Sequence, residues 1–147
     1  MKIETFGFDD FDLTLKTMGE EFGYTDVNKK VLVPALKAAM MTALPTAKSL
    51  ARRKTGTMQE SIKVEARRPT DRDQQSKYVY SYDAAIAILS VKQSKVSLGE
   101  EFGTADKAGN PFIRPAIESN ENSILSSLEK QLKLKIDRYQ ARKSKDK

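Results

Sequence analysis

DVNKKVLVPALKAAMMTALPTAKSLA, residues 26–51, repeats apolar side chains every three or four positions. This spacing places one continuous apolar stripe on a helix. Asp26 belongs to the residue types that cap helix N-termini, so we expect the helix to begin there. Pro34 and Pro45 each remove a backbone donor and crowd the preceding turn. The sequence therefore predicts a kink at each proline, or several shorter helices in series.

A shorter acidic segment precedes this helix. The spacing of Leu15, Met18 and Phe22 predicts a short amphipathic helix that begins near Asp12. Gly23 is placed to end it. We expect the residues before Asp12 to be extended.

The second half of the chain alternates between strand and turn signals. Apolar and charged residues alternate over 62–66, which predicts a half-buried strand, and 84–91 are nearly all apolar, which predicts a strand covered on both faces. Between them, the polar residues 68–76 predict a mobile loop. Residues 93–110 contain three glycines and predict turns, and helical spacing returns over 113–143.

These elements predict an α+β fold with long N-terminal helices, a small antiparallel sheet and a long C-terminal helix. The 147 residues suit a single domain. Within it we distinguish an acidic N-terminal segment (1–25), a core (26–129) and a basic helical tail (130–147).

The net charge of +6 is unevenly distributed. Residues 1–26 carry two lysines against seven acids, a net −5, and residues 130–147 carry eight bases against two acids, a net +6. This asymmetry indicates contact with complementary surfaces. A solvated helix that ends in a frayed tail has the same composition, so charge alone does not decide between the two.

Histidine and cysteine are both absent. Disulfides, zinc sites and thiol or imidazole catalysis are therefore excluded. We expect no enzymatic activity, no metal site and no cofactor. The first residues have no apolar stretch typical of a signal peptide. The sequence also lacks a run of about 18 apolar residues, so it predicts no membrane span.

Two local patterns have a functional and a structural interpretation. Glu100 and Glu101 are adjacent carboxylates, but neighbours on a strand point to opposite faces and do not converge on a cation. Thr55-Gly56 lacks the remaining residues of a phosphate-binding loop. We expect Gly56 to adopt a positive φ in a turn after the long helix.

A third pattern suggests an alternative function, that of a small basic nucleic-acid-binding protein. Tyr78, Tyr80 and Tyr82 share one face of a predicted strand and could stack on bases. Packing is the commoner role of such a row. Four bases, Arg67, Arg68, Arg72 and Lys77, lie near this row in the sequence, and the three arginines would join the basic tail in this function.

Three short strings occur in order between the long helix and the final helix: TGTMQESI at 55–62, EFGT at 101–104 and NPFIRPAIE at 110–118. Together they resemble the neck, or head–tail connector and tail-completion, proteins of long-tailed bacteriophages. The similarity covers about residues 30–125. It departs in Met58, where the family often has leucine, and in lacking a proline just before Thr55. The matching residues are Thr55, Gly56, Met58, Ser61, Ile62, Glu101, Phe102, Gly103, Thr104, Pro111, Phe112, Arg114, Pro115 and Ala116.

The resemblance implies a virion structural protein of the phage neck, at the top of the tail, assembled in the cytoplasm of the host bacterium. It would complete the tail and join it to the head as a ring around the DNA channel, with six-fold symmetry expected. Its partners would be further copies of itself, the head connector and the tail terminator or tail tube proteins. DNA in the channel would be a non-specific contact, and no membrane is involved.

Elementary physics assigns structural roles to the motif residues. Gly56 and Gly103 allow tight reversals of the chain. Phe112 is expected to seat the last helix on the sheet, and Glu101 is the expected ionic partner of Arg114.

The final helix is too long for a small domain of ordinary width. Thirty-odd residues extend roughly 45 Å, whereas a small domain is about 30 Å across. Its outer half still carries apolar side chains, so either another subunit covers them or the helix folds back. We predict an assembly surface formed by Leu132, Ile136 and Tyr139.

Overall fold

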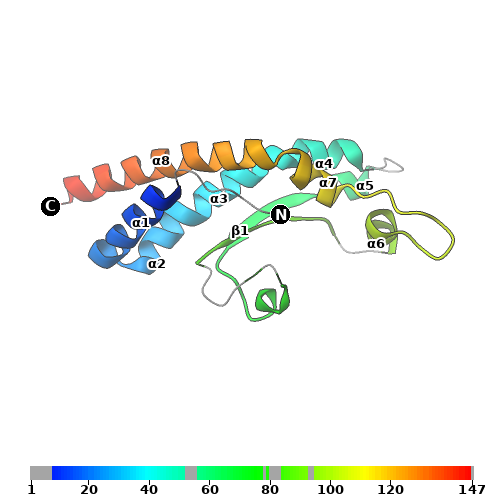
Figure 1. The fold of residues 1–147 in the computed structure, drawn as a ribbon, viewed down its shortest axis with the longest axis horizontal. Coiled ribbons are helices and arrows are strands. Elements are labelled where there is room, and N and C mark those ends of the chain that lie inside the picture. The colour runs from blue at the N-terminus through cyan, green and yellow to red at the C-terminus, as the bar shows by residue number, and fades with distance from the viewer. Residues whose placement is uncertain (1–7, 52–55, 78, 80–83, 93–94, 147) are drawn as a thin grey trace.

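The computed structural model describes residues 8–51, 56–77, 79, 84–92 and 95–146 (Figure 1). The fold is α+β, as the sequence predicts, with a long N-terminal helical region, a two-stranded antiparallel sheet and a long C-terminal helix. The helices are α1 (Phe8–Phe22), α2 (Tyr24–Val27), η1 (Asn28–Leu32), α3 (Val33–Met40), η2 (Met41–Ala43), α4 (Leu44–Leu50), α5 (Thr57–Glu60), η3 (Asp73–Gln75), α6 (Lys95–Phe102), α7 (Ile113–Ser119) and α8 (Glu121–Lys145), and the strands are β1 (Lys63–Arg67) and β2 (Ile86–Ser90).

The helical run from α2 to α4 changes its winding before each proline. A π-helical turn, η1, precedes Pro34, and a 3-10 turn, η2, precedes Pro45. Because proline lacks a backbone N–H and crowds the preceding turn, the regular hydrogen-bond ladder cannot pass either position unchanged. The predicted division into shorter helices in series is confirmed.

The buried stripe of this run repeats every four residues. A four-residue step in a helix of 3.6 residues per turn rotates the stripe by about 40° each time. The stripe therefore faces different elements at its two ends, and it contributes to two buried clusters. It consists of Val27, Val31, Ala35, Ala39, Ala43, Ala47 and Ala51.

The two clusters lie towards opposite ends of the elongated molecule (Figure 1). The first, which we call the sheet cluster, joins α4 to the strands and α7 through residues such as Ile62, Val64, Leu89 and Phe112. The second, which we call the tail cluster, joins α1, α2, η1 and α3 to the C-terminal half of α8. Helix α8 runs beside α3.

The predicted assembly surface on α8 is wrong. Leu132, Ile136 and Tyr139 are 3%, 6% and 1% exposed and belong to the tail cluster. The domain is longer than the width assumed for it, since the helical run over residues 24–50 itself extends about 40 Å. That run and α1 cover α8, so the chain buries these side chains itself.

The prediction that Asp26 caps a helix N-terminus is wrong. Gly23, at φ 97°, separates α1 from α2, and α2 already begins at Tyr24. The Tyr139 hydroxyl instead donates to Asp26 Oδ2 over 2.6 Å. This hydrogen bond, followed by that of Lys30, lowers the pKa of Asp26 to about 2. Burial, and then the Asp26 carboxylate, raise the pKa of Tyr139 to about 12.

Helix boundaries elsewhere differ in three places. Helix α1 begins at Phe8, in the stretch predicted to be extended, while its predicted end before Gly23 is confirmed. Helix α6 occupies part of the region predicted to form turns. The final helix is divided at Asn120, whose side-chain amide donates to Ala116 O (2.8 Å) and Thr46 Oγ1 (2.9 Å).

The strands pair with Val64 opposite Leu89, and both side chains are buried. Ile86 and Ile88 are only partly buried, so the prediction of a strand covered on both faces is wrong. The polar loop is linked to β1 through Asp73. Asp73 accepts two hydrogen bonds from Arg67 (2.7 and 3.1 Å) and further ones from Thr70. The tyrosine row at 78, 80 and 82 lies outside the described residues.

Candidate functional site

The three strings behind the family resemblance meet at one end of the molecule. Ile62 and Phe112 are both buried in the sheet cluster, where Phe112 seats α7 against the strands as predicted. The Asn110 side-chain amide donates to Leu50 O over 3.3 Å and ties the third string to the end of α4. Thr55 lies outside the described residues. The strings therefore form one structural joint, which we call the motif joint (residues 56–62 and 97–116).

Glu101 is the central polar group of this joint. Its carboxylate accepts hydrogen bonds from the backbone N–H groups of Phe112 (2.8 Å), Ile113 (3.1 Å) and Arg114 (3.3 Å). It satisfies the first turn of α7, whose N–H groups have no partner within the helix. Arg114 Nε lies 3.5 Å from Glu101 Oε1, which confirms the predicted ion pair. The sequence did not predict this capping role, because backbone N–H donors are not marked by any residue type.

These contacts set the ionisation of Glu101. Burial alone would raise its pKa, but the three backbone N–H groups, that of Phe112 first, and Arg114 outweigh burial and lower the pKa below its ordinary value of 4.5. A carboxylate whose pKa is lowered on folding stabilises the folded state at every pH above its ordinary, unfolded-state pKa. This stability is lost as the pH falls through the lower folded-state pKa.

We therefore predict that Glu101→Gln destabilises the protein mainly at neutral pH. Hydrogen bonds to a charged group contribute about 1.5–3 kcal/mol each, and glutamine retains the acceptor without the charge. We expect a loss of about 1–3 kcal/mol at pH 7. The difference from wild type should shrink as urea unfolding is repeated from pH 5 down to pH 3. A difference that is constant with pH would show that the charge of Glu101 contributes nothing.

The remaining motif residues hold the backbone of the joint. Gly56 and Gly103 have φ values of 81° and 82°, so both predicted reversals are confirmed. The Ser61 hydroxyl donates to Met58 O (2.7 Å) and accepts from Lys92 N (3.3 Å), linking α5 to the residues after β2. Thr104 Oγ1 accepts from Lys107 N over 3.2 Å. Pro111 is exposed, and Pro115 lies in the first turn of α7.

Among the side chains of helix α6 that the structure describes, two polar ones lie inside and two apolar ones lie outside. Ser97 and Glu101, four residues apart, are 2% and 7% exposed, and the Ser97 hydroxyl donates to Lys92 O. Leu98 and Phe102, also four residues apart, are 49% and 71% exposed. Residues at this spacing share a helix face. A surface helix normally has the opposite arrangement, with its apolar face towards the core.

The exposed pair Leu98 and Phe102, which we call the α6 face, is the candidate functional site. Phe102 is a residue of the EFGT string, yet it serves no buried cluster of the described chain. Its ring contacts the Arg114 guanidinium, which lies 5.8 Å from the ring centroid. Sequence reasoning selected Phe102 but missed its exposure, because the nearby glycines suggested turns. Two pairs at a four-residue spacing, Ser97 with Glu101 and Leu98 with Phe102, were the available signal for a helix.

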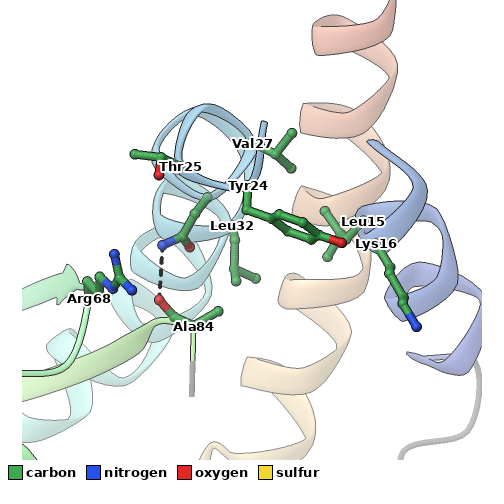
Figure 2. A pocket seen from close by; sticks show the side chains of 9 residues that line it. Leu15, Lys16, Tyr24, Thr25, Val27, Leu32, Arg68 and Ala84 are labelled. Carbon is green, nitrogen blue, oxygen red and sulfur yellow. Dashed lines mark hydrogen bonds between the residues drawn. The ribbon is translucent and has the colours of Figure 1, made fainter. Parts of the chain in front are cut away.

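A hollow of about 370 Å³ is lined by α1, α2, η1, Arg68 and Ala84 (Figure 2). Its walls include apolar side chains and the cations Lys16 and Arg68. The Asn28 side-chain amide donates a hydrogen bond to Ala84 O over 3.0 Å. Its described lining contains no carboxylate.

Comparison with protein-family models, curated proteins and solved structures finds no match to this chain. The described residues contain no cluster of three or more acidic, cysteine or histidine side chains that could hold a metal ion. No helix within the described ranges is both long and apolar enough to cross a membrane.

Proposed function

We propose that this protein is a structural subunit of the phage neck, a ring that completes the tail and joins it to the head. It acts by binding its neighbours rather than by turnover. The observation that carries the proposal is the exposure of Phe102 within a string that otherwise builds the motif joint. Burying an exposed phenylalanine or leucine gains roughly 1.5–3 kcal/mol. This gain is available to a neighbouring subunit and is not used by the described chain itself.

A ring is built from head-to-tail contacts, in which each subunit offers two different surfaces. Helix α6, which carries the α6 face, lies towards one end of the elongated molecule, away from the C-terminus (Figure 1). This position suits contact with the next subunit around a ring. We assign the next copy of the chain as its partner, and we expect the head connector and the tail terminator or tail tube proteins to bind above and below.

The alternative function, a small basic nucleic-acid-binding protein, is less well supported at the β1–β2 loop. Arg67 forms a two-pronged ion pair with Asp73, so its charge is already neutralised. Arg68 and Arg72 remain exposed. Together with the exposed Lys77, they leave three of the four bases named from the sequence on this surface, which is weaker for phosphate binding than all four would be.

Changing Leu98 and Phe102 together to serine tests the proposed function. Truncating an interface hydrophobe typically costs about 1–2 kcal/mol, so two changes should weaken each subunit contact about 30- to 1,000-fold. The variant should melt like wild type, because both side chains are exposed. Light scattering should show smaller assemblies, and electron microscopy of infected cells should show heads and tails that fail to join.

Met41→Ser with Leu134→Ser is the matched control. These side chains are also apolar and are 44% and 40% exposed, but they lie outside α6. Assembly should be normal in this control. The proposal fails if the α6 variant assembles as wild type does. It also fails if the variant loses stability, because the α6 face would then belong to the chain's own packing.

A further inference from the structure

A groove with a basic lining runs between the C-terminal half of α8 and the start of the long helical run. Its volume is about 450 Å³, and four of its six lining side chains are cationic. No carboxylate is among them. We call it the basic groove, and it is lined by Lys30, Pro34, Lys135, Arg138, Ala141 and Arg142.

Three of these cations form a row on one face of α8. Lys135, Arg138 and Arg142 follow one another at steps of three and four residues, which places them on one side of the helix. The tail cluster behind them, with Leu132, Ile136 and Tyr139 buried against the N-terminal helices, holds this part of α8 in place. The row is therefore carried on a supported helix and not on a frayed tail.

The charges of this row are not neutralised within the part of the chain that the structure describes. Lys135, Arg138 and Arg142 form no ion pair there, whereas the neighbouring Lys30 and Lys143 lie 2.9 and 3.7 Å from the Asp26 carboxylate. Like charges on one helix face repel each other. A bound polyanion would relieve this repulsion.

The dimensions of the row match a nucleic-acid backbone. Lys135 and Arg142 are seven residues apart, or about 10 Å along the helix axis. One strand of duplex DNA places a phosphate every 3.4 Å along its axis, so the row spans about three phosphates. The apolar part of the lining is only Pro34 and Ala141, which is too little for the apolar core of a protein–protein interface. Contacts to phosphates carry no sequence information, so binding of the backbone by this row would not select a base sequence.

We propose that the basic groove binds the phosphate backbone of duplex DNA without sequence preference. The inference adds a second surface to the proposed neck protein, at the opposite end from the α6 face. It rests on the proposed function only where it identifies the bound DNA as the packaged phage genome. The binding itself is a property of the isolated chain, so its test is separate from the head–tail joining assay.

The test measures binding of a fluorescent 20-base-pair duplex by anisotropy between 50 and 200 mM salt. Three phosphate contacts give a slope of about −2.7 in log K against log salt, an approximately 40-fold loss of affinity over this range. Arg138→Gln with Arg142→Gln should leave a slope of about −0.9 and a loss of about 3- to 4-fold. Both side chains are exposed, so thermal unfolding should be unchanged.

Arg68→Gln with Arg72→Gln is the matched control, since it removes the same charge from the β1–β2 loop. Its slope should equal that of wild type. An equal loss of slope in both variants would mean diffuse attraction by net charge, and a loss in the control alone would place the DNA site on the loop. Either result overturns the proposal. So does the absence of DNA binding by wild type at 50 mM salt, or binding that does not weaken between 50 and 200 mM. A groove variant that changes the assembly mass but not DNA binding overturns it too, in favour of an acidic protein segment as the occupant.

Discussion

Changing Leu132 and Ile136 together to serine is expected to unfold the isolated chain. Both side chains are buried in the tail cluster, at 3% and 6% exposure. Truncating a buried leucine or isoleucine costs about 2–5 kcal/mol, and the whole stability of a domain is about 5–15 kcal/mol. Thermal unfolding followed by circular dichroism should show a midpoint lower by about 10 °C or more, or no cooperative transition.

Leu134→Ser is the control for this variant, because Leu134 lies on the same helix and is 40% exposed. It should shift the midpoint by no more than about 2–4 °C. Should the double variant melt like wild type while heads and tails fail to join, the buried placement of Leu132 and Ile136 would be wrong. They would then form the assembly surface predicted from helix length.

Gly103→Val is expected to produce the second large loss of stability. A β-branched residue at a φ of 82° is strained by about 1–3 kcal/mol. A Cβ at this position would also lie 2.8 Å from Gly109 N and 3.1 Å from Lys107 O, which are backbone atoms that cannot rotate away. The strain and the close contacts together should lower the free energy of unfolding by about 2–5 kcal/mol and the melting midpoint by about 5–15 °C.

Gly23→Val separates the two causes. Gly23 has a φ of 97°, but a Cβ there would meet no atom within 4 Å, so only the backbone strain applies. Gly56→Val, at a φ of 81°, should likewise lose about 1–3 kcal/mol. If Gly103→Val melts no lower than Gly23→Val, the loop around Gly103 rearranges at no cost and the close approach to Gly109 is not required.

Several features of the fold follow from the sequence because they depend on neighbouring residues. The apolar spacing over residues 26–51 predicts the helical run, and the chemistry of proline predicts its divisions at Pro34 and Pro45. Gly56 and Gly103 adopt the positive φ values expected of them. The ion pair of Glu101 with Arg114 is an exception, since it joins residues 13 positions apart and was predicted from two complementary charges at the motif junctions.

The tertiary structure decided what lies against each apolar face. Leu132, Ile136 and Tyr139 were recognised as apolar, but their partners come from α1 and the long helical run, far away in sequence. Tyr139 and Asp26 form their hydrogen bond across 113 positions. For α6 the difference is greater still, because Glu101 points inwards to cap α7 while Leu98 and Phe102 point outwards. Side-chain periodicity shows which residues avoid water, but which surface covers them depends on the lengths and paths of distant elements.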